Sequence, residues 1–373
     1  MQARTQQSGF SLIEMMVGMV VGLATIAVIF QSYAAFEGRK RTTTNASDAQ
    51  ENGLIALRAI EADARMSGFG LLAPSGLACT SMNWYYNGAV GTSPIAPAII
   101  YDGGGNGASD SIAFTYSDSP AGSSPAMLTS AMPTSDAFIN MSSISLTGFL
   151  QNLDQFLVAT PSFAGNAIPC SRLAYVDKTV TNPPPAALAL YNPPTGTNIF
   201  PQGSVTGYNG FESVAINMGN FIQNQYGVSA NNLAVTDVSI PNQPAIKLSS
   251  NIVNVQAQYG VAPFNPTPGS PAPAVNCWTD AAGSICNPSS GDWANPGAAD
   301  IARIKAIRVA IVARSVLLEK PQKNGVCNTT TVAPVSWAGG PLIDLSADPN
   351  WQCHRYRVYQ TVIPLRNVIW ANI

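Results

Sequence analysis

The chain has 373 residues, of which only 10% are charged and 46% are apolar, and its formal net charge at pH 7 is −2. An average soluble protein has roughly 25% charged residues, so the surface is expected to be polar but mostly uncharged. The small net charge argues against a nucleic-acid partner, because such a partner requires a basic surface. The length allows one large domain or two smaller ones.

An apolar segment from Phe10 to Phe30 is the first feature along the chain, and Glu14 is its only charged residue. At about 1.5 Å per residue, a helix of this length crosses a hydrocarbon core of roughly 30 Å. A carboxylate inside a membrane costs about 2.5–3.5 kcal/mol, so Glu14 requires a partner. The sequence therefore predicts one membrane-spanning helix near the N-terminus.

The residue that precedes this segment is small, whereas an ordinary secretory signal places its small cleavage residues after the apolar core. Cleavage between Gly9 and Phe10 would keep the apolar segment on the mature protein, with Glu14 as its fifth residue. The new α-amino group of Phe10 would then be a natural partner for Glu14, within one subunit or between neighbours. The alternative is a plain single-pass anchor that contains an isolated glutamate.

The stretch Gly9-Phe10-Ser11-Leu12-Ile13-Glu14 closely resembles the class III leader of type IV pilins and pseudopilins. This resemblance implies that a prepilin peptidase cuts after Gly9 and methylates Phe10. It also implies that Glu14 sets the axial register between packed subunits.

Helical spacing continues beyond the apolar segment, and the first proline is Pro74. Leu54, Leu57 and Ile60, with Ala64 completing the row, recur at intervals of three and four residues, which predicts an amphipathic helix whose apolar face holds the rest of the chain. One helix is expected over about 10–66, ended by the glycines that follow. The same spacing places four charged residues on its other faces: Glu51, Arg58, Glu61 and Asp63.

Several further stretches resemble PilW-type minor pilins, namely residues 50–57, 65–69, 306–309 with 314–315, and 364–367. This resemblance covers both ends of the chain but not its middle, and it is more specific than the leader, which all pilins share. It implies that the amphipathic half of the helix packs on an antiparallel sheet.

All six cysteines lie beyond the predicted helix: Cys79, Cys170, Cys277, Cys286, Cys327 and Cys353. An even number of cysteines beyond a membrane span favours disulfides in an oxidising compartment. The close spacings favour Cys277–Cys286 and Cys327–Cys353, which leaves Cys79–Cys170. A metal site is the alternative, but the chain has no C-x-x-C pair and only one histidine. That histidine, His354, is expected to be a surface or packing residue.

The charges around the predicted span conflict with this topology. Arg39, Lys40 and Arg41 follow the span and only Arg4 precedes it, so the positive-inside rule alone would place the C-terminal part in the cytoplasm. The cysteines and the leader both place that part outside the cytoplasm, and we give them precedence.

Alternating apolar residues predict strands at residues 111–116, 253–261, 305–316 and 355–367. Proline-rich stretches at 181–185, 192–194 and 262–273 are expected to be loops. The predicted fold class is therefore α+β, with a long N-terminal helix packed on an antiparallel sheet and an enlarged, disulfide-linked, β-rich head.

The sequence contains no convincing catalytic set. A single histidine excludes the H-E-x-x-H zinc motif and disfavours a Ser-His-Asp triad, and no glycine precedes a lysine as a P-loop requires. Residues 102–110 carry oxygen ligands spaced loosely like a calcium loop, but a flexible hairpin before the next strand is the favoured interpretation. Trp278 and Trp293 are expected to pin their loop rather than to form an exposed patch. No enzymatic activity, metal or cofactor is expected.

Four segments are expected: a prepilin leader at 1–9, a transmembrane and assembly helix at 10–36, an amphipathic helix at 37–70, and the head at 71–373. The resemblance implies a minor pilin that primes or caps pilus assembly in a tip complex with other minor pilins and the major pilin, supporting twitching, adhesion or secretion. It would first reside in the inner membrane with its head in the periplasm and later at the pilus tip on the cell surface. The alternatives are a GspJ-like minor pseudopilin of a type II secretion system, a tip adhesin for an unknown surface ligand, and a membrane-tethered hydrolase that uses His354.

Overall fold

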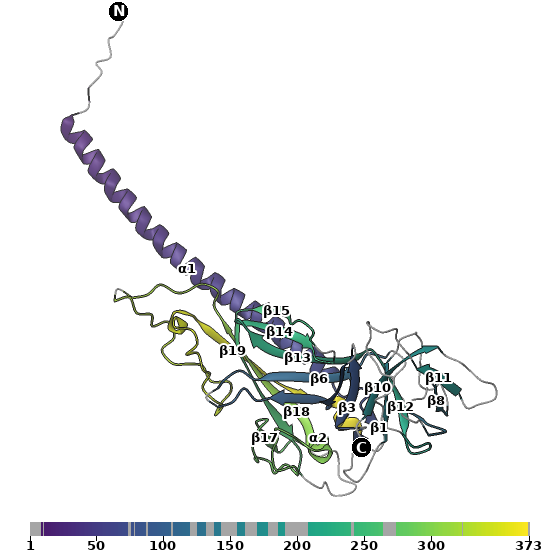
Figure 1. Ribbon diagram of the computed structural model, residues 1–373. Coiled ribbons are helices and arrows are strands. Elements are labelled where there is room, and N and C mark those ends of the chain that lie inside the picture. The colour runs from purple at the N-terminus through teal and green to yellow at the C-terminus, as the bar shows by residue number, and fades with distance from the viewer. Residues whose placement is uncertain are drawn as a thin grey trace, which may run out of the picture.

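The computed structural model describes residues 9, 11–73, 76–77, 79–86, 89–105, 107–119, 125–131, 138–142, 155–160, 170–177, 186–190, 208–239, 242–263, 274–322 and 324–371. One long helix, α1 (Leu12–Met66), leads into a head made of β-sheets (Figure 1). The C-terminal half of α1 packs on the head and the N-terminal half projects away from it. This arrangement confirms the predicted α+β fold.

Two antiparallel sheets lie against α1. The order of the first sheet is β15 (Ile246–Ser250), β14 (Asn232–Asp237), β13 (Phe221–Ser229), β6 (Ser111–Ser117) and β5 (Ala98–Tyr101). The order of the second is β17 (Cys277–Thr279), β16 (Ile252–Val261), β18 (Ile304–Arg314) and β19 (Tyr356–Pro364). Strands β6, β16, β18 and β19 lie where the alternating pattern predicts them, and each contributes buried apolar side chains to the main core, among them Ile112, Val255, Ile307 and Ile363.

A third sheet lies farther along the head. Its strands are β4 (Ala89–Pro94), β3 (Ser81–Tyr86), β10 (Cys170–Asp177), β9 (Gln155–Ala159), β12 (Val214–Gly219) and β7 (Pro125–Met127), with β11 (Ala186–Leu190) linking β10 to β8 (Phe138–Met141). Strands β3 and β10 pair in parallel and the other pairs are antiparallel. The short strands β1 (Leu72–Ala73) and β2 (Gly76–Leu77) form a separate hairpin.

Two short helices were not predicted from the sequence. The first, α2 (Ala298–Arg303), immediately precedes β18, and the second, α3 (Arg366–Ala371), follows β19. The predicted loops at 181–185 and 192–194 lie outside the described residues, as does most of the third loop at 262–273.

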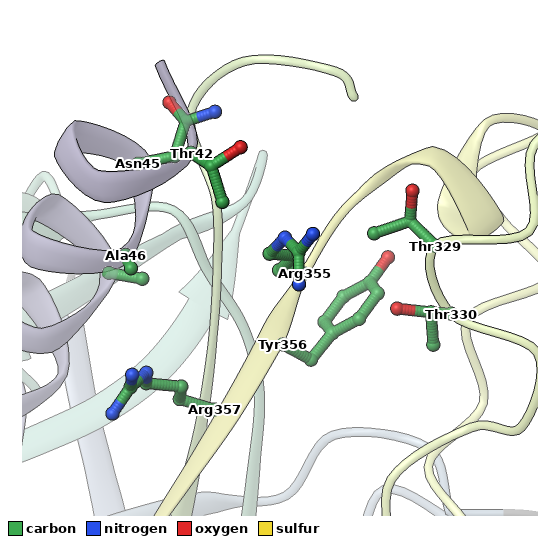
Figure 2. A pocket seen from close by; sticks show the side chains of 9 residues that line it. Thr42, Asn45, Ala46, Thr329, Thr330, Arg355, Tyr356 and Arg357 are labelled. Carbon is green, nitrogen blue, oxygen red and sulfur yellow. The ribbon is translucent and has the colours of Figure 1, made fainter. Parts of the chain in front are cut away.

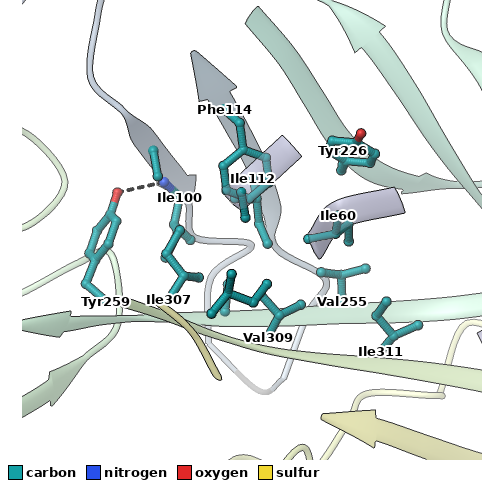
Figure 3. Packing of buried hydrophobic residues seen from close by; sticks show 14 of the residues in the cluster. Ile60, Ile100, Ile112, Phe114, Tyr226, Val255, Tyr259, Ile307, Val309 and Ile311 are labelled. Carbon is teal, nitrogen blue, oxygen red and sulfur yellow. Dashed lines mark hydrogen bonds between the residues drawn. The ribbon is translucent and has the colours of Figure 1, made fainter. Parts of the chain in front are cut away.

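The main core forms where α1 meets the first two sheets (Figure 3). Ile60 of α1 is fully buried among Phe114, Tyr226 and Ile311 of the surrounding strands. The two sheets are also joined by a hydrogen bond of 2.6 Å, which the backbone N–H of Ile100 donates to the Tyr259 hydroxyl. A second core under the third sheet contains the Cys79–Cys170 pair.

The buried face of α1 differs from the predicted one. Ile60 is buried and Leu57 is partly buried, but Leu54 is 42% exposed, so its predicted contact with the head is wrong. The buried row is made mainly of small residues: Asn45, Ala49, Gly53, Ala56, Ile60 and Ala64. A Cβ atom on Gly53 would overlap the ring of Tyr359 in β19. The helix therefore approaches the sheet closely through small side chains, and the larger Leu54 turns outward.

Three disulfides join Cys79 to Cys170, Cys277 to Cys286, and Cys327 to Cys353, the pairs expected from their spacing. The second of these closes the loop 277–286, and Trp293 lies seven residues beyond Cys286. That tryptophan is 1% exposed, its ring lies 5.9 Å from the ring of Tyr259, and its indole N–H donates to the carbonyl of Ile285. Trp293 therefore pins its loop to the core, as predicted.

Candidate functional site at the stem and its junction with the head

The N-terminal end of α1 is closed by its own side chains. The hydroxyl of Ser11 accepts a hydrogen bond of 3.3 Å from the backbone N–H of Ile13, and the carboxylate of Glu14 accepts one of 3.1 Å from the N–H of Ser11. This reciprocal pair satisfies backbone donors that a helix start otherwise leaves unpaired. Glu14 therefore caps the helix start.

The N-terminal half of α1 is both apolar and exposed. Its most apolar window of 18 residues has a mean hydropathy of 2.3, and none of that window is buried. Among the described residues, α1 is the one helix that is long and apolar enough to cross a membrane. Such a surface requires either a lipid environment or a neighbouring apolar surface.

Asp63 joins α1 to the first sheet. Its carboxylate accepts hydrogen bonds from the hydroxyls of Tyr116 at 2.9 Å and Tyr226 at 2.7 Å, and from the side-chain amide of Asn224 at 2.9 Å. Burial, together with the charge of Asp63, raises the pKa of both tyrosines well above the ordinary value. The Asp63 carboxylate thus joins α1 to two neighbouring strands of the head, β6 and β13.

A polar pocket of about 320 Å³ lies between α1 and the start of β19 (Figure 2). Its lining consists of Thr42, Asn45, Ala46, Ala49, Thr329, Thr330, Arg355, Tyr356 and Arg357. The guanidinium of Arg355 donates to Glu319 at 3.0 Å, whereas that of Arg357 has no hydrogen bond or ion pair within the described part of the chain. Guanidinium and hydroxyl donors suit an anionic or carbonyl-containing group, so the pocket can bind but has no paired nucleophile and base for catalysis.

The hairpin at residues 102–110 is docked rather than flexible. The carboxylate of Asp110 accepts hydrogen bonds from the N–H groups of Gly103 at 2.9 Å and Ala257 at 2.8 Å, and the Asn254 amide donates to the carbonyl of Gly107. Burial raises the pKa of Asp110 to about 6, with the neighbouring charges of Asp102 and Asp280 adding to the effect. Both oxygens are already engaged by the backbone, so Asp110 is placed to fix the loop to β16. No cluster of three or more metal-ligating side chains occurs in the described ranges.

His354 is buried beside the loop that follows β18, which makes it a packing residue. Its Nδ1 lies 2.9 Å from the carbonyl oxygen of Ser315. Its Nε2 lies 3.6 Å from a carboxylate oxygen of Asp348, which also pairs with Arg314. Burial and the charge of Arg314 lower the pKa of His354 below its usual value. The neutral ring is therefore favoured in the folded protein.

This shift predicts a loss of stability in mild acid. The unfolded chain takes up a proton on His354 near pH 6.5 but the folded chain does so only at lower pH, so the free energy of unfolding falls as the pH drops below about 6.5. His354→Asn keeps a donor for the Ser315 carbonyl but does not titrate. Melting temperatures measured between about pH 7 and about pH 5 should fall more in the natural protein than in this variant. Parallel profiles would contradict the assignment.

Comparison with known families gives a match in the N-terminal residues. Residues 4–30 match a family model described as the prokaryotic N-terminal methylation motif. The chain carries a prepilin leader. Among solved structures, it is similar to a type IV-like pilin from Thermus thermophilus, with 12% identity over 59% of this chain and 87% of that chain and a TM-score of 0.23. A comparison with curated protein sequences gave no match.

The matched residues include Gly9, where the sequence predicts cleavage. Gly9 is exposed, and among the described residues none beyond its chain neighbours lies within 4 Å of the position that a Cβ would take. The following residue, Phe10, lies outside the described residues. The cut after Gly9, the methylation of Phe10 and the register role of Glu14 stay predictions.

Sequence reasoning missed two features of the junction. Asp63 was assigned to an outer face, although it follows Ile60 by three residues and Ala56 by seven, which places it on the buried face. That spacing was a usable signal. The pocket could not be predicted from the sequence, because Thr42 and Arg357 come from opposite ends of the chain and meet only in the folded protein.

Proposed function

We propose that this protein is a PilW-type minor pilin that primes or caps a type IV pilus within a tip complex of minor pilins. The observation that carries the proposal is the prepilin leader, continuous with an exposed apolar half-helix that ends in a large β-rich head. The apolar half of α1 would lie in the inner membrane before assembly and among other pilin helices afterwards. The partners would be other minor pilins, the major pilin and a prepilin peptidase.

The proposed membrane topology places the head in the periplasm. Three disulfides in the head support a periplasmic location, because the cytoplasm keeps thiols reduced. Leader, transmembrane helix, amphipathic helix and head would occupy 1–9, 10–36, 37–70 and 71–373, although α1 runs without a break across the second boundary. Copurification with pilus components supports this function, and copurification with type II secretion components instead would favour a minor pseudopilin.

Replacing Glu14 tests the assembly role. Glu14→Ala should leave the head folded but reduce piliation by at least about tenfold, because an unpaired α-amino group in a membrane-embedded helix bundle is costly. Pilus counts by electron microscopy provide the measurement.

Two further variants test whether reduced piliation in Glu14→Ala comes from the lost charge or from the lost helix cap. Ser11→Ala removes the hydroxyl that caps α1 but keeps the Glu14 carboxylate, so it should retain piliation. Glu37→Ala removes an exposed acid from α1 outside the apolar segment and should also have no effect. Equal defects in Glu14→Ala and Ser11→Ala would show that Glu14 acts only as a cap.

A further inference from the structure

The loop that follows β18 exposes apolar side chains that the fold does not use. Val316, Leu317 and Leu318 are 44%, 44% and 46% exposed, and Val326 of the same loop is 54% exposed. Three consecutive exposed apolar residues are uncommon on a soluble surface and indicate a contact with something else. We call the described residues of this segment, 316–322 and 324–326, the 316–326 loop.

The 316–326 loop is held firmly in this exposed position. The side-chain amide of Asn45 in α1 donates to the carbonyl of Leu317 at 3.3 Å, and the N–H of Glu319 donates to the carbonyl of Cys353 at 2.8 Å. A turn joins Gln322 to Val326, and the Cys327–Cys353 disulfide closes the end of the loop. The apolar side chains are therefore presented outward by a fixed backbone.

The loop lies at the end of the head from which α1 projects. Thr42 of α1, which contacts Glu319, lies about 18 Å beyond Phe30 along the helix axis at 1.5 Å per residue. Between them, Tyr33 and Phe36 are 68% and 69% exposed, as suits aromatic residues at a membrane interface. The loops after β18 reach from the head toward the free part of α1 (Figure 1). An extended chain covers about 10 Å in three residues, enough to bring the loop turn from Thr42 to the level of Phe36.

The charges at this end of the head are mainly basic. Arg39, Lys40 and Lys320 are exposed, and the nearby acid Glu319 is already paired with Arg355. Glu37 is the remaining exposed acid of α1 between the aromatic residues and Thr42. Basic side chains next to an apolar surface match an anionic membrane surface, where the charges meet lipid headgroups and the apolar groups enter the interface.

We infer that the 316–326 loop is a second membrane contact, which rests its apolar side chains on an anionic phospholipid surface beside the point where α1 enters the bilayer. The inference depends on the membrane-anchored state in the proposed function. Two attachment points would fix the tilt and rotation of the head before assembly, which a single helix alone does not. Extraction into a pilus would then break this contact as well as withdraw the helix.

Fluorescent labels can test the contact in the full chain. All six native cysteines are paired, so an introduced cysteine is the only free thiol. Leu318→Cys and Val326→Cys, each labelled with nitrobenzoxadiazole, are reconstituted in phosphatidylcholine vesicles with or without phosphatidylglycerol and with a headgroup nitroxide quencher. Ile285→Cys is the matched control, because Ile285 is 61% exposed but lies in the loop after β17.

Quenching at positions 318 and 326 should exceed that at 285 by at least about twofold, and it should increase when phosphatidylglycerol is present. Replacing Arg39, Lys40 and Lys320 together by serine should remove that increase. Equal quenching at all three positions would overturn the inference, and so would a signal that follows the protein-to-lipid ratio and not the lipid charge, which would indicate a second copy of the chain. Flotation with vesicles is measured in parallel: its loss would contradict the membrane anchoring itself, whereas flotation without selective quenching contradicts only the loop contact.

Discussion

Gly9→Val should leave the chain unprocessed in cells that contain a prepilin peptidase, with the cleaved form reduced by at least about tenfold. Cleavage at a small residue requires that no side chain obstruct the scissile bond, and valine is branched next to the backbone. No described atom lies near the position of a Cβ on Gly9, so the substitution disturbs no packing within the described part of the chain. Intact mass spectrometry of the purified protein measures the result: full-length protein from the variant, and a chain that starts at methylated Phe10 from the natural sequence.

Gly18→Val is the matched control for this experiment. Gly18 lies in the same apolar segment, and a Cβ there meets no described atom within 4 Å outside the adjacent helix backbone. Normal cleavage of Gly18→Val together with failure of Gly9→Val would place the effect at the leader. Normal cleavage of Gly9→Val, or retention of Ser8 or Gly9 in the natural protein, would refute the proposed processing and with it the pilin assignment.

Asp63→Ala should be the most destabilising single change at the junction between stem and head. It removes an acceptor from two tyrosine hydroxyls and one amide, all partly buried. Hydrogen bonds to a charged group contribute about 1.5–3 kcal/mol each, but their effects overlap in one network, so we expect a loss of about 3–4 kcal/mol. Chemical denaturation of the full chain in detergent, followed by tyrosine fluorescence, measures this loss.

Glu61→Ala provides a matched control two residues away on the same helix. Glu61 pairs with Arg65 one turn later, and the Arg65 side chain is 56% exposed. Exposed pairs of this kind contribute about 0.3–0.5 kcal/mol, so this variant should remain close to the natural protein. Asp63→Asn adds a second test. It preserves the shape of the side chain, but it replaces one accepting oxygen with an NH2 group that faces the hydroxyl and amide donors. An Asp63→Ala variant as stable as Glu61→Ala would show that the junction is held by apolar packing alone.

Features encoded in contiguous residues were predictable from the sequence alone. The leader, the length of the apolar helix, the alternation in β6, β16 and β18 and the two short-range disulfides each depend on residues that are close in sequence. Their physical basis is local: side-chain size at a cleavage site, rise per residue, the twofold period of a strand, and the reach of a short loop.

Only the tertiary structure decided that Leu54 lies outside the buried face of α1 and which residues Asp63 contacts. Leu54 looked suitable for the core, but it is 42% exposed, and the sheet approaches α1 too closely at the neighbouring Gly53 to accept a side chain there. Asp63 looked like a solvent-exposed charge, but it meets Tyr226, which is 163 residues away in the sequence. A hydrogen bond between residues so far apart produces no periodic pattern in the sequence, because it forms only where two distant segments pack together. The same holds for the polar pocket and the exposed 316–326 loop, whereas the leader needs no tertiary contact at all.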